Sequence, residues 1–76
     1  MPTLEDLEPG QHATIERIEG TVTLVQRLLE MGLTEGEEVE FLARAPLGDP
    51  LEIRIRSYQL SLRKSVAKEV HVRLAR

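Results

Sequence analysis

Apolar residues alternate with polar ones in the second half of the chain, a pattern that is typical of strands. They occupy every second position in two neighbouring segments, Val39, Phe41 and Ala43 in the first and Leu51, Ile53 and Ile55 in the second. Charged residues fill most positions between them, so each segment is expected to be a strand with one buried face. Residues 45–50, Ala-Pro-Leu-Gly-Asp-Pro, separate the segments and suit a turn, since proline cannot donate a ladder hydrogen bond. The pattern therefore predicts a hairpin with Leu47 at its tip.

Shorter alternating segments flank this hairpin. A first strand is expected to start near Gln11 and to bulge or end at Ile18, which falls out of the period of two. Leu60 and Leu62 indicate a short fourth strand, and residues 65–69 indicate a single helical turn. Val70, Val72 and Leu74 alternate with polar residues in a closing strand.

Residues 23–31 carry the only helical pattern of useful length. Leu24, Val25, Leu28, Leu29 and Met31 have the spacing of a helix with one buried face. Thr23 followed by Gln26 fits a capping box at its start.

The end of this helix has a clear stop signal. Gly32 stands where a left-handed C′ residue is wanted, which brings Leu33 back to contact Leu28. Met31 and Leu33 are accordingly expected in the core, and Gly36 is expected to supply the positive φ of the following turn.

Five short strands, a single helix and a helical turn around one small core favour a partly open barrel over a flat sheet with two bare edges. With 76 residues, the chain is expected to form one mainly β domain over residues 1–76.

The amino-acid composition excludes several classes of function. The chain has no cysteine, which excludes disulfides, thiolate metal sites and thiol nucleophiles. Its formal net charge of −3 and its two aromatic residues argue against nucleic acid as a partner. Neither a signal peptide nor a membrane-spanning segment is visible, so a cytoplasmic protein without direct membrane insertion is expected.

No constellation of residues indicates catalysis or a cofactor. His12 and His71 are the only imidazole ligands, and we interpret both as exposed strand residues because no dense cluster of further ligands surrounds them. Glu35, Glu37 and Glu38 are interpreted as a solvated turn, since alternate strand residues point to opposite faces. We therefore expect no catalytic residue, no metal ligand and no cofactor.

A partner-binding surface is the remaining candidate site. Leu42 falls on the polar face of its strand and Leu47 on the hairpin tip, so both are expected to be exposed anchors. Arg54 and Arg56 share the outward face of the next strand and are expected to orient a partner, or else to pair with Glu38 or Glu40 across the sheet. Asp49 completes the candidate surface.

Three segments together resemble the FeoA family. They are Arg-Leu-Leu-Glu-Met-Gly-Leu-Thr-Glu-Gly at 27–36, Ala-Pro-Leu-Gly-Asp-Pro at 45–50 and Leu-Ser-Leu-Arg-Lys at 60–64, with Leu4, Leu7 and Gly10 placed as in the family's opening pattern. The resemblance covers nearly the whole chain. Its structural motif residues are Gly10, Met31, Gly32, Leu33, Gly36, Pro46, Gly48 and Pro50.

The resemblance implies an SH3-like barrel and an accessory role in bacterial ferrous iron uptake. It implies binding to the cytosolic part of a FeoB-type GTP-dependent transporter and modulation of that transporter. Two alternatives stay open: an activator that inserts an arginine into the GTPase site, and a metal-sensing domain like the related barrel of metal-dependent repressors. The sequence also leaves self-association open.

Overall fold

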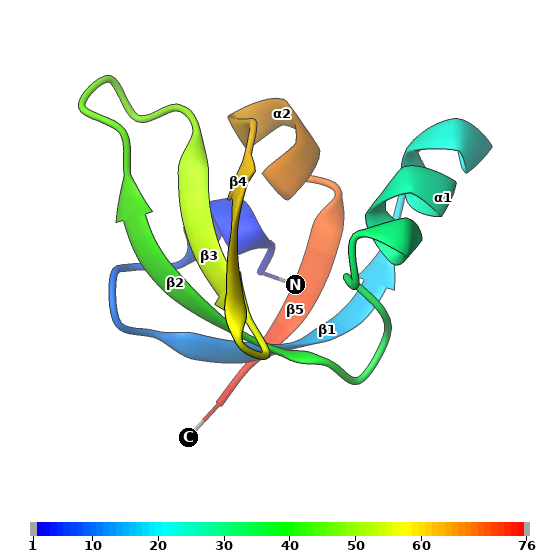
Figure 1. The fold of residues 1–76 in the computed structure, drawn as a ribbon, viewed down its shortest axis with the longest axis horizontal. Helices are drawn as coiled ribbons and strands as arrows, with labels where there is room; N and C mark the ends of the chain where they lie inside the picture. The colour runs from blue at the N-terminus through cyan, green and yellow to red at the C-terminus, as the bar shows by residue number, and fades with distance from the viewer. Residues whose placement is uncertain (1, 76) are drawn as a thin grey trace.

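A computed structural model describes residues 2–75 of the chain. Within these residues, five antiparallel strands form one sheet in the order β4-β3-β2-β1-β5. Their bounds are His12–Ile18 for β1, Glu38–Arg44 for β2, Leu51–Ile55 for β3, Tyr58–Leu62 for β4 and Val70–Leu74 for β5. The sheet curls into a barrel that stays open between β4 and β5, with α1 (Val22–Glu30) beside the opening and α2 (Lys64–Ala67) above it (Figure 1).

The barrel interior holds a single apolar core. Phe41 is its largest side chain and is fully buried, and no polar side chain is buried among the described residues. β3 follows the predicted alternation without exception, because Leu51, Ile53 and Ile55 are buried and the residues between them are exposed. The prediction of a mainly β, partly open barrel with five strands, one helix and a helical turn is confirmed, and α2 is that turn.

Two bulges change the alternation in the strands that form the middle of the sheet. The pairing of β1 with β5 shifts register between Ile15 and Arg17. Because of this shift, the Ile18 side chain is partly buried against the core. The pairing of β2 with β3 shifts between Phe41 and Ala43. A bulge adds one residue to one strand and bends it. Ala43 is consequently exposed, so its predicted inward position is wrong.

The helix begins earlier than predicted. Its N-cap is Thr21, whose hydroxyl accepts a hydrogen bond from the Leu24 backbone N–H at 3.1 Å, so the predicted cap at Thr23 is wrong. Both threonines are competent caps. In addition, the Val25 backbone N–H donates a hydrogen bond to the Thr21 carbonyl.

The end of the helix agrees with the sequence. The Leu33 N–H bonds to the Leu28 carbonyl and the Gly32 N–H bonds to the Leu29 carbonyl, both at 3.0 Å, which is a Schellman motif. Gly32 has φ +98°, and Leu33 is fully buried. The Tyr58 hydroxyl of β4 donates to the Met31 carbonyl at 2.6 Å and so connects the helix end to the barrel.

The N-terminal segment covers one side of the barrel. It contains the 3-10 helix η1 (Leu4–Asp6), and its leucines, Leu4 and Leu7, are buried. The Arg44 guanidinium at the end of β2 donates to the carbonyls of Glu5 at 2.6 Å and Leu7 at 3.0 Å. Within residues 2–75, no helix has the length and apolar character needed to cross a membrane.

Candidate partner-binding surface

The tip of the β2–β3 hairpin presents an isolated leucine to solvent. Leu47 is 97% exposed, as the sequence predicts. The turn is closed by backbone hydrogen bonds from Gly48 to the Ala45 carbonyl at 2.7 Å and from Ala45 to the Pro50 carbonyl at 3.0 Å. The hairpin therefore displays an apolar side chain on a hydrogen-bonded turn.

Asp49 has a structural contact at the base of the same hairpin. Its Oδ1 accepts a hydrogen bond from the Lys64 backbone N–H at 2.9 Å, at the start of α2. This satisfies one of the N–H groups that a helix start leaves unpaired. Asp49 therefore fixes the hairpin base to α2, and the opposite carboxylate oxygen is the one available to a partner.

Leu42 does not form an exposed anchor. It lies at the bulge in β2 and is half-buried, so the prediction that it is exposed is wrong. The physical reason is the register shift itself, because an added residue turns the side chain away from the polar face that strict alternation would give it.

Arg54 and Arg56 are held by carboxylates across the sheet. Arg54 Nη1 lies 3.2 Å from Glu40 Oε1, and Arg56 binds Glu37 Oε2 through Nη2 at 2.7 Å and Nε at 3.2 Å. The hydrogen bond from Arg56 lowers the pKa of Glu37, and the same contact raises the pKa of Arg56. The predicted cross-strand pairing is thus present, with Glu37 in place of Glu38.

The five predicted partner-binding residues do not form one patch. Arg56 lies in the turn after β3, with φ +56°, and does not share a strand face with Arg54. Leu47 precedes β3 and Arg56 follows it, so the two are separated by the length of the strand, roughly 17 Å for five residues. A shallow hollow of about 280 Å³ beside the arginines is lined mainly by polar side chains, including His12 and Glu38.

A second surface feature was missed by the sequence reasoning. A groove of about 330 Å³ runs between α1 and the segment formed by β4 and α2. Apolar side chains line most of it, namely Leu24, Leu28, Met31, Leu62 and Val66, and the remaining lining residues are Arg27, Ser61 and Arg63. The available signal was the width of the apolar helix face. Only Leu28 of α1 is fully buried, whereas a face needed entirely for the core would bury its neighbours as well.

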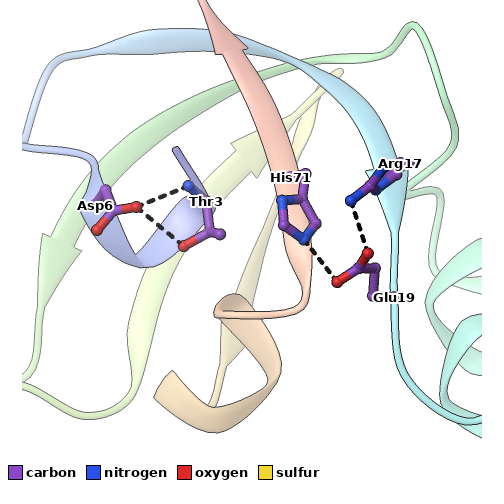
Figure 2. Close-up of polar contacts among 5 residues, drawn as sticks. All are labelled: Thr3, Asp6, Arg17, Glu19 and His71. Carbon is purple, nitrogen blue, oxygen red and sulfur yellow. Dashed lines mark hydrogen bonds and ion pairs between the residues drawn. The ribbon is translucent and has the colours of Figure 1, made fainter. Parts of the chain in front are cut away.

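His71 belongs to a polar cluster at the end of β1 (Figure 2). Its side chain is only 16% exposed, and its Nε2 lies 3.1 Å from Glu19 Oε1, while Arg17 Nη2 binds Glu19 Oε2 at 2.7 Å. The hydrogen bond with His71, followed by the charge of Arg17, lowers the pKa of Glu19. His71 Nδ1 is buried without a hydrogen-bond partner within residues 2–75. The interpretation of His71 as an exposed strand residue is therefore wrong.

The described residues contain no group of three or more histidine, aspartate or glutamate side chains placed to hold a metal ion. His12 Nδ1 lies 4.0 Å from Glu38 Oε2, on a different part of the sheet from the His71 cluster. The two imidazoles therefore do not converge.

Comparison with known proteins assigns the chain to a family. The FeoA domain family matches residues 3–74. The chain is 39% identical over 71 residues to a Fe(2+) transport protein A/Fe(2+) transporter FeoB fusion protein of Porphyromonas gingivalis, a match that covers 93% of this chain and 8% of that protein. The chain thus spans a small part of that relative's length.

Solved structures give the same result. Iron(II) transport protein A of Clostridium thermocellum is 38% identical with a TM-score of 0.91, and the match covers 96% of this chain and 45% of that one. The FeoA of Stenotrophomonas maltophilia in complex with zinc, described as a prokaryotic SH3 domain protein, is 33% identical with a TM-score of 0.82 and coverage of 95% and 89%. A manganese-dependent transcriptional repressor has a TM-score of 0.90 at 17% identity, which shows a shared fold only. The fold is therefore SH3-like, and the chain belongs to the FeoA family.

Proposed function

We propose that this domain is a non-catalytic cytoplasmic adaptor of ferrous iron uptake, which binds the cytosolic part of a FeoB-type transporter and modulates it. The observation that carries the proposal is the Porphyromonas gingivalis relative, whose name joins Fe(2+) transport protein A and the transporter FeoB in one fusion protein. Fusion of two domains in one chain supports a direct association between their separate counterparts.

We place the docking contact at the tip of the β2–β3 hairpin. Leu47 is the most exposed large hydrophobic side chain among the described residues, and its burial is favourable without a charged partner, by roughly 1.5–3 kcal/mol if it is fully covered. Asp49 holds the hairpin base in place, so little ordering is required on binding.

The contacts of Arg54 and Arg56 favour a role in orienting the partner over insertion of an arginine into the partner's nucleotide site. Each guanidinium already binds a carboxylate, and an arginine that enters a GTPase site would have to leave its partner. Exposed ion pairs of this kind contribute little to affinity but affect the association rate.

Calorimetric titration with the isolated cytosolic domain of a FeoB-type transporter tests the proposal. We expect the parent chain to bind and Leu47→Asp to abolish binding. Val22→Asp is the matched control, because Val22 is 85% exposed and lies on α1, on the other side of the molecule from the hairpin (Figure 1).

The outcomes separate two kinds of failure. If the parent chain does not bind, the proposed function is wrong. If Leu47→Asp binds as the parent does, the adaptor role stands and the hairpin tip is the wrong surface.

A further inference from the structure

The groove between α1 and β4 has an apolar floor that the barrel does not cover. Three half-buried side chains form this floor, namely Leu24, Met31 and Val66. Each packs against the core on one side and lines the groove on the other. A side chain that fills such a groove gains burial without displacing any part of the core.

One wall of this groove is the open edge of the sheet. β4 pairs with β3 alone, and no described segment pairs with its other side. Ile55 and Tyr58 close a two-residue hairpin and so form a hydrogen-bonded pair, after which bonded and non-bonded pairs alternate. The backbone N–H and C=O groups of Gln59 and Ser61 therefore point to the open edge.

This edge lacks the usual protection against pairing. Natural edge strands are blocked by charged side chains, proline, bulges or a covering segment. β4 reads Tyr-Gln-Leu-Ser-Leu, with neither charge nor proline, and its pairing with β3 is free of bulges. It is a template for one more strand.

The charges at the groove are of one sign. Arg27 and Arg63 are its only charged lining residues, and within residues 2–75 neither side chain makes an ion pair or hydrogen bond. This contrasts with Arg54 and Arg56, which are both paired. Two unpaired guanidiniums beside an apolar floor favour a segment that carries carboxylates next to apolar side chains.

We propose that the groove binds an extended acidic segment of a partner protein by β-strand addition to β4. The main chain of the segment pairs with Gln59 and Ser61, its apolar side chains enter the groove, and its carboxylates bind Arg27 and Arg63. A second copy of this chain fits less well, because its β4 has no carboxylate to bind Arg27 and Arg63. The groove adjoins the base of the β2–β3 hairpin, where Asp49 and Pro50 share a hollow with Ser61 and Arg63, and it does not include Leu47 at the tip.

The probe for this proposal is an acetylated and amidated peptide of alternating leucine and glutamate, titrated into the ¹⁵N-labelled full chain. We expect amide shifts that map to β4 and to the groove side of α1. A peptide of alternating leucine and lysine should bind at least about ten-fold more weakly. The double variant Arg27→Glu/Arg63→Glu should reverse this preference.

Main-chain pairing has its own test. Methylating alternate peptide nitrogens on the edge that faces β4 should abolish binding, whereas methylating the other set should not. Ser61→Pro removes an outward N–H without removing a bond to β3, so it should fold and lose the peptide. Ser61→Thr, which keeps that N–H, is the matched control.

Absence of shifts with the leucine-glutamate peptide, or shifts centred elsewhere, would overturn the proposal. Equal binding of the acidic and basic peptides would overturn the role of the arginines. Equal tolerance of both methylation sets would refute strand addition, whatever happens to the folding of Ser61→Pro.

Discussion

Replacing Gly32 with alanine should destabilise the fold by about 1.5–3.5 kcal/mol, through two separate effects. The first is the backbone, because φ +98° is a left-handed conformation that costs a residue with a β-carbon roughly 1–2 kcal/mol. The second is steric, since the added Cβ would lie 2.2 Å from the Tyr58 hydroxyl. Tyr58 is partly exposed and can move, so its loss is limited to the hydrogen bond to the Met31 carbonyl, about 0.5–1.5 kcal/mol.

Urea unfolding followed by far-ultraviolet circular dichroism measures both effects. Gly36→Ala is the matched control, because Gly36 has φ +90° and a Cβ there would meet no atom within 4 Å. It should therefore cost only the backbone term, about 1–2 kcal/mol.

A double-mutant cycle with Tyr58→Phe isolates the contact. Without the hydroxyl, the nearest ring carbon is 3.6 Å from the new Cβ, an ordinary contact. The cost of Gly32→Ala should then fall to that of Gly36→Ala. Equal costs for Gly32→Ala and Gly36→Ala in the parent background would refute the contact with Tyr58, and no cost for either would refute the backbone argument.

Two further changes test contacts that hold the barrel together. Arg44→Met removes the hydrogen bonds to the Glu5 and Leu7 carbonyls and should cost about 1–2 kcal/mol in urea unfolding, while Arg54→Met, which removes only an exposed ion pair, should cost less than about 1 kcal/mol. The pKa of Glu37 is lowered below its ordinary value of 4.5 in the folded state, so its contribution is present above that pH and is lost as the pH falls through the folded pKa. Glu37→Gln should therefore flatten the acid limb of the stability profile, and an unchanged acid limb would show that the pair with Arg56 does not contribute.

The sequence predicts those parts of the fold that depend on local chemistry. The Schellman stop at Gly32 follows from backbone preferences within one turn, and β3 follows from strict alternation. The bulges could not be predicted in the same way, because an added residue is defined only against the partner strand. The prediction that Leu42 is exposed was wrong for that reason.

The candidate surface was less predictable than the fold. The exposure of Leu47 follows from its place on a proline-flanked turn, whereas the separation of Leu47 from Arg56 depends on where β3 begins and ends. The groove beside α1 arises from the fit between a helix and a barrel opening, and no property of either segment alone reveals how much of the helix face stays uncovered.

The strand order also has a kinetic consequence. β2, β3 and β4 follow one another through short turns, so their pairing closes small loops, whereas the pairing of β1 with β5 joins Ala13 to Leu74 from opposite ends of the chain. Closing the longer loop costs more chain entropy before any contact compensates for it, and distant pairings slow folding. We expect the β2–β4 meander to be structured in the folding transition state and β5 to dock late. φ-values for conservative truncations should accordingly be higher at Ile53 than at Val72, and the reverse order would show that closure of the chain ends comes first.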